Sequence, residues 1–144
     1  MTESDLQVMV ADYLRMRYPD VLFHSDFGSG IKLTMGQAAK QKRQNGGRRA
    51  WPDMFVAKPM LGLDKDNQPF YKHGLFLELK KDGVKIFKKD GSYVADQHIR
   101  EQAQVLEHLC RLGYVAVFAV GFDEARAIID KYLGGRNETR KEIF

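Results

Sequence analysis

Apolar residues recur along the chain with two different spacings, and each spacing predicts a type of secondary structure. Spacings of three and four residues, as in Leu6, Val10 and Tyr13, predict helices over residues 3–17, 96–112 and 123–133. A further helix is expected over residues 35–44, because Thr34 and Gln37 fit a capping box and Asn45-Gly46-Gly47 fits a helix end. Short apolar runs predict strands over residues 21–25, 53–57, 74–80 and 114–120, the last of them buried.

The order of these elements, α-β-α-β-β-α-β-α, predicts an α/β domain in which helices cover both faces of a mixed sheet. The strand at residues 74–80 is the most apolar, so we expect it inside the sheet and not at an edge. Residues 58–74 carry prolines and turn residues and should form a hairpin connection, and residues 81–94 a loop or small hairpin. The 144 residues show no repeat or linker, which predicts one domain over residues 1–134 and a charged tail at 135–144.

The strand at residues 74–80 carries a carboxylate and an ammonium group on the same face. Side chains alternate along a strand, so Glu78 and Lys80 share a face with Phe76, and the opposite face carries only leucines. Burying these charges inside a sheet is costly unless they pair with each other or bind a charged ligand. Two interpretations stay open at this point: a structural ion pair between Glu78 and Lys80, or part of a binding site.

Two Pro-Asp dipeptides precede apolar runs, and either aspartate could join Glu78. Asp20 is separated from Glu78 by a helix and a further strand, so nothing local couples the two. Asp53 begins the strand that precedes that of Glu78, and an antiparallel hairpin is the simplest pairing for two such strands. We therefore interpret Pro19-Asp20 as a helix-to-strand turn and assign Asp53 to the candidate site.

The position of the hairpin turn decides which residue lies opposite Asp53. A turn centred immediately before Asp66 places Asp53 opposite Glu78, and a turn centred immediately after Asp66 places it opposite Lys80. Both registers put Asp53 on the face of Glu78, whereas a slip of one residue would put it opposite Leu79 on the other face.

Two carboxylates on opposed strand positions predict a cation between them. Directly opposed Cβ atoms lie roughly 4.5–5.5 Å apart, where the two negative charges repel. A hard divalent cation with oxygen ligands, most simply Mg²⁺, fits such a pair. Lys80 would lie beside the ion and could orient or deprotonate a water molecule, or stabilise negative charge on a phosphate. This combination is suited to phosphodiester hydrolysis.

The distribution of charge points to a polyanionic substrate. The formal net charge is +4 and the isoelectric point about 9.2. No acidic residue lies between Asp26 and Asp53, and a second basic run follows Glu78. A solvated basic face is the alternative, but the two runs flank the carboxylates, where they would contact a phosphate backbone without reading its sequence. The expected contacts are Lys32, Lys40, Lys42, Arg43, Arg48 and Arg49 from the first run, and Lys81 and Lys85 from the second.

Two polar residues lie in line with the apolar stripes of predicted helices. Glu3 precedes the stripe of the first helix, and Gln102 falls between His98 and Val105 in that of residues 96–112. Each could reach solvent at the end of its stripe, or both could point at the metal site; His98 is the weaker candidate. Cys110 is the single cysteine, which excludes an intrachain disulfide and a multi-cysteine metal site, and we expect it to be a buried thiol.

Three stretches together resemble the VRR-Nuc (virus-type replication-repair nuclease) branch of the PD-(D/E)XK nuclease superfamily. They are "QNGGRRAWPDMFV", "HGLFLELKK" and "QAQVLEHLCRLGYVAVFAVGFDEARAIIDKYL", within a match that runs from the first helix to residue 133. The resemblance implies a restriction-endonuclease-like core with a mixed sheet flanked by helices. By residue it implies Asp53, Glu78 and the Leu79 carbonyl as metal ligands, Lys80 as the catalytic lysine, and Glu3 and Gln102 beside the site.

The resemblance also implies an activity: a Mg²⁺- or Mn²⁺-dependent endonuclease for structured or branched DNA, such as four-way junctions, that leaves a 5′-phosphate. Small stand-alone members are similar to homodimeric junction-resolving enzymes of phage or prophage origin. A non-catalytic nucleic-acid-binding module on the same fold is the alternative. Ala50 departs from the glycine frequent in the family, and Trp51 either packs in the core or stacks on a base or ribose. The chain has no run of 18 apolar residues and no apolar leader, so we expect a cytoplasmic protein and no membrane partner.

Overall fold

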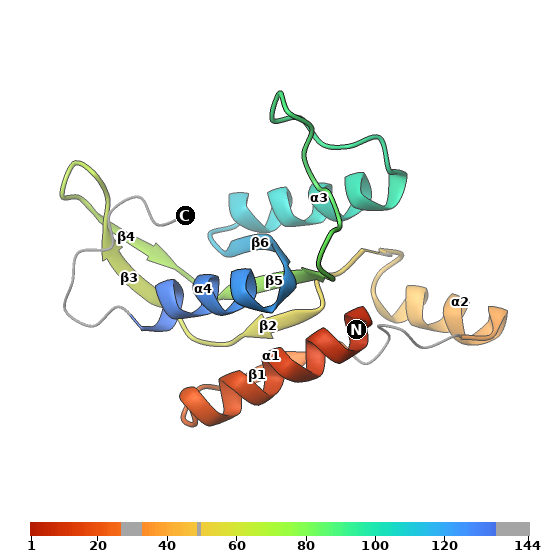
Figure 1. The fold of residues 1–144 in the computed structure, drawn as a ribbon, viewed down its shortest axis with the longest axis horizontal. Helices are drawn as coiled ribbons and strands as arrows, with labels where there is room; N and C mark the ends of the chain where they lie inside the picture. Colours follow the sequence, from red (N-terminus) through yellow and green to blue (C-terminus); the bar gives the residue numbers. More distant parts are fainter. Residues whose placement is uncertain (27–32, 49, 135–144) are drawn as a thin grey trace.

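A computed structural model of the chain describes residues 1–26, 33–48 and 50–134 (Figure 1). The tail expected at 135–144 lies outside the described residues. In chain order the elements are α1 (Glu3–Arg17), β1 (Phe23–Ser25), α2 (Met35–Gln44), β2 (Met54–Val56), β3 (Met60–Leu63), β4 (Pro69–Lys72), β5 (Leu75–Lys80), α3 (Gln97–Arg111), β6 (Val115–Val120) and α4 (Gly121–Leu133).

Four strands form the predicted mixed sheet, and their order is β1-β2-β5-β6. β2 pairs antiparallel with β1 and β5, and β5 pairs parallel with β6. The interior position expected for β5 is confirmed. β6 is correctly predicted as a strand, but it is only partly buried. α3 and α4 cover its two faces, whereas no described strand pairs with its outer edge.

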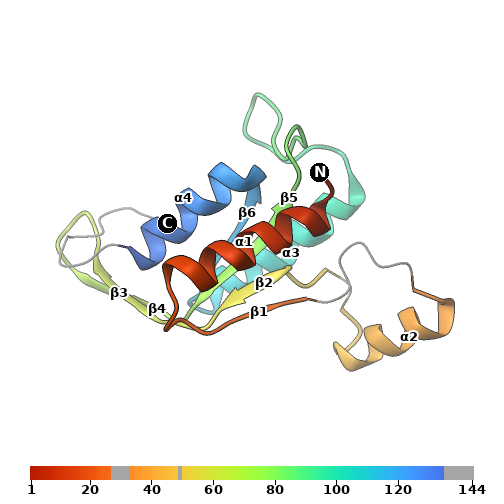
Figure 2. The ribbon, with the colours of Figure 1, turned by 60° about the horizontal axis from the view of Figure 1, so that its bottom comes forward.

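Helices cover both faces of the sheet (Figure 2). The two faces differ in the residues that pack on them. On one face α1 and α4 pack on the leucines of β5, and this large core includes Leu6, Val10 and Ile129. On the other face α3 packs against β6 through a smaller cluster that contains Val105, Leu106, Leu109, Ala116 and Ala50. The small-cluster face is the one that carries Glu78.

The segment between β2 and β5 contains two strands that the sequence analysis treated only as a connection. β3 and β4 form a separate two-stranded antiparallel sheet, in which Met60 pairs with Lys72. The paired residue numbers sum to 132 in this hairpin and to 131 between β2 and β5, where Met54 pairs with Leu77. The difference arises because three residues, 57–59, lie between β2 and β3, whereas only two, 73–74, lie between β4 and β5. One unpaired residue therefore resets the register between the two sheets.

The predicted helices form with the expected ends. Thr2 caps α1 through a capping box with Asp5, and Thr34 caps α2 through a capping box with Gln37. α2 buries none of its residues, and Figures 1 and 2 both show it standing away from the sheet. Pro19-Asp20 forms the predicted turn after α1. None of the helices in the described part of the chain is long and apolar enough to cross a membrane.

The prediction of a buried Cys110 is wrong. The buried stripe of α3 runs through Ile99, Gln102, Val105 and Leu109, and Cys110 lies one position further round the helix, where it is exposed. Its Sγ lies 3.4 Å from the Ala116 carbonyl oxygen. Leu112, the last residue of the helix predicted over residues 96–112, follows the end of α3 and is 56% exposed.

Gly74 offers a test of how closely β5 is packed at its start. A Cβ atom at this position would lie 2.6 Å from the Phe55 ring and 3.1 Å from the Val56 carbonyl oxygen. Gly74→Ala is therefore expected to lower the free energy of unfolding by about 1–3 kcal/mol, measured by urea denaturation.

Gly36→Ala is the matched control for Gly74→Ala. A Cβ atom at Gly36 would meet nothing within 4 Å, and alanine favours the helix, so stability should stay equal or rise by up to ~1 kcal/mol. Equal stability of the two variants would contradict the close packing described for Gly74.

Candidate active site

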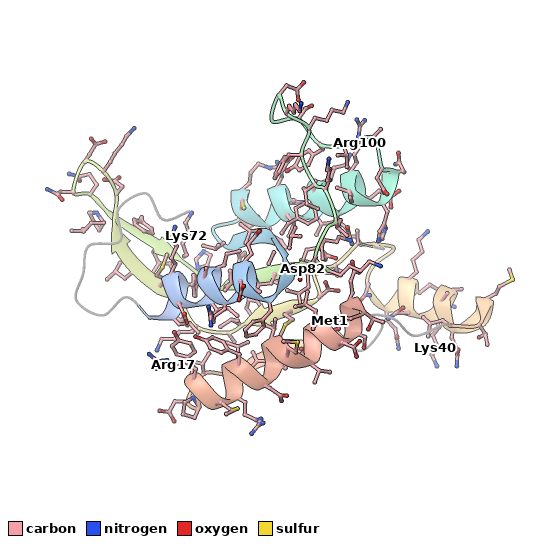
Figure 3. The ribbon with its side chains drawn as sticks, viewed as in Figure 1. Met1, Arg17, Lys40, Lys72, Asp82 and Arg100 are labelled. Carbon is pink, nitrogen blue, oxygen red and sulfur yellow. The ribbon has the colours of Figure 1, made fainter. Side chains whose placement is uncertain are left out.

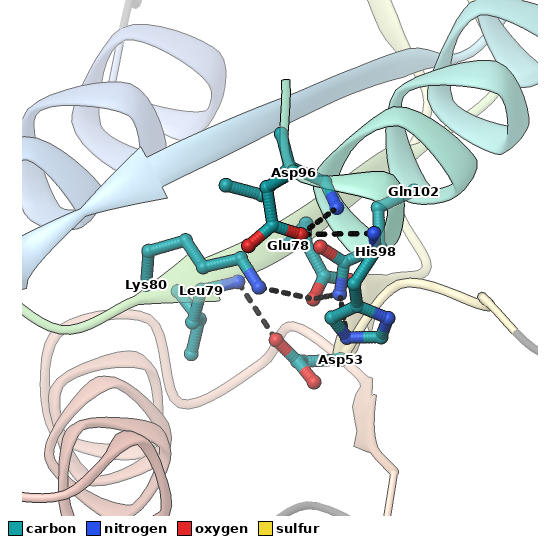
Figure 4. Close-up of polar contacts among 8 residues, drawn as sticks. Asp53, Glu78, Leu79, Lys80, Asp96, His98 and Gln102 are labelled. Atoms are coloured by element: carbon teal, nitrogen blue, oxygen red, sulfur yellow. Dashed lines mark hydrogen bonds and ion pairs between the residues drawn. The ribbon is translucent and has the colours of Figure 1, made fainter. Parts of the chain in front are cut away.

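The pairing of β2 with β5 brings Asp53 next to Glu78. The observed register matches Met54 with Leu77, and its continuation by one residue places Asp53 opposite Glu78. This is the first of the two registers that the sequence allows. The Leu79 N–H donates a hydrogen bond of 2.7 Å to Asp53 Oδ2, which orients the carboxylate across the strand pair (Figure 4).

The backbone around Asp53 is held from the other side by β1 and α1. The Asp53 carbonyl oxygen accepts a hydrogen bond of 2.6 Å from the Asp26 N–H, just beyond the end of β1. The Gln7 side chain of α1 donates to the carbonyl oxygens of Asp26 at 2.8 Å and Asp53 at 3.5 Å. Asp53 is therefore fixed by contacts from three elements before any ligand binds.

Glu78 is almost completely buried, with 3% of its surface exposed. Its Oε1 accepts a hydrogen bond of 2.6 Å from Gln102 Nε2 of α3, and Lys80 Nζ lies 3.9 Å from the same oxygen. The Gln102 amide nitrogen also lies 3.2 Å from His98 Nε2. The other oxygen, Glu78 Oε2, is buried and has no hydrogen-bond partner in the described structure. One side of this carboxylate is thus supported and the other is unsatisfied.

Burial disfavours the ionisation of both carboxyl groups, and the charge of Asp53 further disfavours that of Glu78. Burial raises the pKa of Asp53, and the hydrogen bond from Leu79, the side-chain contact with Glu78 and the charge of Lys80 counteract only part of this effect. Burial, and then the nearby charge of Asp53, raise the pKa of Glu78 far above its ordinary value, against a smaller opposite effect of Lys80. Glu3 adds a further negative charge that raises both pKa values. The site therefore has an excess of negative charge.

This arrangement fits a divalent cation. A cation near Glu78 Oε2 and Asp53 would satisfy the unpaired oxygen and remove the repulsion between the carboxylates. Within the described residues no group of three or more His, Cys, Asp or Glu side chains is arranged to hold a metal. The two carboxylates would therefore supply part of a coordination shell, which suits Mg²⁺ because it retains several water molecules. The Leu79 amide is fixed by Asp53, and a ligand role for the Leu79 carbonyl stays a prediction.

A pocket opens over the carboxylates and brings most of the predicted site residues together. Its lining includes Asp53, Glu78 and Gln102, and Glu3 at the start of α1 faces it as well. Lys80 does not line the pocket. It is 5% exposed, and its contact with the site is the ion pair with Glu78. The functional interpretation of Gln102 gains support, because its side chain is buried and bonded to Glu78.

The predicted basic contacts separate into three groups. Lys42 at the end of α2 and Arg48 after it line the pocket with the carboxylates. Lys40 and Arg43 are exposed on α2, whereas Lys81 and Lys85 are exposed on the loop after β5 and are not part of the pocket lining (Figure 3 labels Lys40). Lys32 and Arg49 lie outside the described residues.

The sequence analysis did not identify two residues of the site and ranked a third too low. Gln7 and Asp26 act through contacts with Asp53, 46 and 27 residues away along the chain, which no local pattern announces. The one available signal was the position of Gln7, a full helical turn after Glu3 on the same helix. His98 was ranked low as a helix-end residue, yet it lines the pocket and contacts Gln102.

Ala50 and Trp51, the two positions before Pro52, both pack against the fold. The Ala50 side chain is buried against α3, in the cluster with Val105, Leu106 and Leu109. Trp51 packs on Phe76 at 5.9 Å between ring centroids, but it stays 39% exposed and lines the pocket. Trp51 is therefore partly packed, as the first alternative expected. Its accessible side leaves room for the second, stacking on a base or ribose, which stays a prediction.

A comparison with solved structures identifies the fold. The architecture, with Asp53 immediately before β2 and Glu78 on the neighbouring β5, is that of a PD-(D/E)XK-like α/β core. A solved structure named "VRR_NUC domain protein" superposes with a TM-score of 0.59 over 93% of this chain and 89% of that chain, at 24% sequence identity. The chain therefore has the fold of a VRR-Nuc domain, as the sequence resemblance implied. No protein-family model matches the sequence, and no curated protein matches it.

The excess of negative charge gives a pH-dependent prediction. The pKa of Glu78 is higher in the folded protein than in the unfolded chain, so the folded state binds more protons above pH ~4.3. Metal-free wild-type protein should therefore lose stability as the pH rises from 5 to 8. Glu78→Gln keeps an acceptor for Gln102 but carries no charge, so at pH 8 without metal it should exceed the wild type by ~1 kcal/mol or more, about 2–4 °C in Tm.

Thermal unfolding in EDTA at both pH values measures the difference. Glu107→Gln is an exposed control that retains Glu78, so its stability should follow that of the wild type at both pH values. Addition of Mn²⁺ at pH 8 should raise the Tm of the wild type and not that of Glu78→Gln. A wild-type advantage at pH 8 in EDTA would contradict the uncompensated charge of Glu78.

Proposed function

We propose that this protein is a Mg²⁺- or Mn²⁺-dependent endodeoxyribonuclease that hydrolyses phosphodiester bonds in structured or branched DNA. The observation that carries the proposal is the pair of carboxyl groups of Asp53 and Glu78. One Glu78 oxygen is buried and unsatisfied, and the buried Lys80 lies near the other. A structural ion pair between Glu78 and Lys80 would not account for the second carboxylate or for the unsatisfied oxygen. The VRR-Nuc fold supports the same class of activity.

Each residue of the site has a role that follows from its contacts. Asp53 and Glu78 would hold the metal ion, which when bound would activate a water molecule and neutralise negative charge on the phosphate. Lys80 supplies a buried positive charge that stabilises the charge developing on the phosphate or orients the attacking water. Gln102 holds Glu78 in place with its amide, and Glu3 adds negative charge at the pocket wall.

The pocket lining supports a nucleic-acid substrate. Lys42 and Arg48 face the same pocket as the carboxylates, so a phosphate near Asp53 would have cationic side chains on its other side. α2 buries none of its residues in the fold and carries further exposed cations, Lys40 and Arg43. A helix that contributes nothing to the core but lines the site is suited to hold the substrate.

A cleavage assay tests the proposal. Purified protein with Mg²⁺ or Mn²⁺ should nick supercoiled DNA and cut a four-way junction, and EDTA should abolish both activities. Asp53→Ala and Lys80→Ala should each lower the cleavage rate by more than ~100-fold, because they remove a metal ligand and the buried cation. Both variants should retain salt-dependent DNA binding, measured by fluorescence anisotropy.

Asp20→Ala is the matched control, since Asp20 follows the other Pro-Asp turn and is exposed. It should cut like the wild type. Undiminished cleavage by Asp53→Ala and Lys80→Ala would rule out the site. DNA binding that is equal in EDTA and Mn²⁺, with no cleavage of any DNA by the wild type, would instead favour a non-catalytic binding module.

A further inference from the structure

A row of aromatic side chains begins at the carboxylate pocket and crosses the sheet to the β3–β4 hairpin. Neighbouring ring centroids along it lie 5.9, 5.2, 5.4 and 5.1 Å apart. In order from the pocket, this aromatic row consists of Trp51, Phe76, Tyr114, His73 and Tyr71. Because its members come from three separate segments of the chain, the row exists only in the folded protein.

The aromatic row lies on the less covered face of the sheet. α3 packs on this face against β6, and no other described helix joins the core cluster there. Phe55 of β2 flanks the row, with its ring 4.4 Å from that of Phe76, and it is only half-buried. Its partner across the strand pair, His24 of β1, is exposed. Three members of the row are exposed: Trp51 at 39%, Tyr71 at 54%, and His73.

Two glycines hold rings of this surface against the backbone. A Cβ atom at Gly113 would lie 2.7 Å from the His73 ring, and Gly113 has a positive φ of 99° that other residues rarely adopt. A Cβ atom at Gly74 would lie 2.6 Å from the Phe55 ring. The rings therefore rest on the main chain in fixed positions, which lowers the entropic cost of binding a flat ligand.

The position of Trp51 indicates what binds here. Trp51 belongs both to the aromatic row and to the wall of the pocket, where Lys42 and Arg48 provide positive charge. A nucleic-acid strand with a phosphate at the carboxylates would therefore have its next nucleotides within reach of the row. Aromatic side chains stack on bases whose faces are accessible, as in a single strand, and this stacking does not depend on sequence.

We propose that the aromatic row binds an unpaired DNA strand that leads away from the cleaved phosphate, so the preferred substrate has single-stranded nucleotides next to the cleavage site. The proposal rests on the proposed function only for the position of the cleaved phosphate. Binding of the unpaired strand follows from the row itself and needs neither metal nor cleavage.

Trp51 is the only tryptophan in the chain and reports directly on the start of the row. Metal-free protein is titrated with a short oligothymidylate and, separately, with a blunt duplex of equal phosphate number, while tryptophan fluorescence is recorded. The oligothymidylate should quench the fluorescence to saturation, and the duplex should bind at least ~10-fold more weakly by the same signal, because its bases are already stacked.

Tyr71→Ala tests the far end of the row and leaves the reporter in place. Loss of one stacked base should raise the Kd for oligothymidylate by ~5-fold or more. Tyr71→Phe keeps the ring and should bind within about twofold of the wild type. Phe87→Ala is the matched control, because Phe87 is 53% exposed but is not part of the row and stacks on Tyr93; it too should bind within about twofold.

Three results would overturn the proposal: no quenching by oligothymidylate, equal affinity of Tyr71→Ala and the wild type, or fluorescence that depends on protein concentration and not on DNA. The last result would assign the row to contacts between copies of this chain.

Cleavage assays distinguish a failure of this proposal from a failure of the proposed nuclease function. Strand binding through the row without cleavage in Mg²⁺ would overturn the nuclease proposal and support the row as a strand-binding surface. Equal cutting of blunt and single-strand-tailed duplexes by the wild type and Tyr71→Ala would overturn the row's role and support the nuclease proposal.

Discussion

The register of β2 on β5 is the constraint on which the candidate site depends. Because side chains alternate along a strand, a slip of one residue would move Asp53 from Glu78 to Leu79 and to the opposite face. The β3–β4 hairpin pairs in that slipped register, and one extra residue before β3 restores the register that joins the carboxylates. The hydrogen bond from the Leu79 N–H to Asp53 Oδ2 then fixes the alignment at the site itself.

One face of β5 stabilises the fold, and the other carries residues of the candidate site. Its leucines are at most 1% exposed and belong to the large core, where each contributes roughly 1.5–3 kcal/mol of hydrophobic burial. The other face buries Glu78 and Lys80 with an unsatisfied carboxylate oxygen, which is destabilising without a cation. The leucine core can support this cost, and a bound cation would offset it, so metal affinity and folding stability should be coupled.

Local sequence patterns predicted the helices, the central strands and both candidate registers, because periodicity and capping depend on neighbouring residues. β3 and β4 were taken for a connection because prolines and turn residues obscured short strands. Gln7 and Asp26 escaped notice because their contacts with Asp53 join distant segments. Cys110 was misplaced because one position on a helix turns a side chain by ~100°. The aromatic row was not foreseeable, since it forms only when three segments meet.

The central claim is that Asp53 and Glu78 are arranged to bind a divalent cation. Calorimetric titration of Mn²⁺ into metal-free protein tests it most directly, with Asp53→Asn as the comparison, since asparagine can still accept the hydrogen bond from Leu79. The account predicts saturable binding to the wild type and its loss in Asp53→Asn. No binding to the wild type, or equal binding to both proteins, would contradict it.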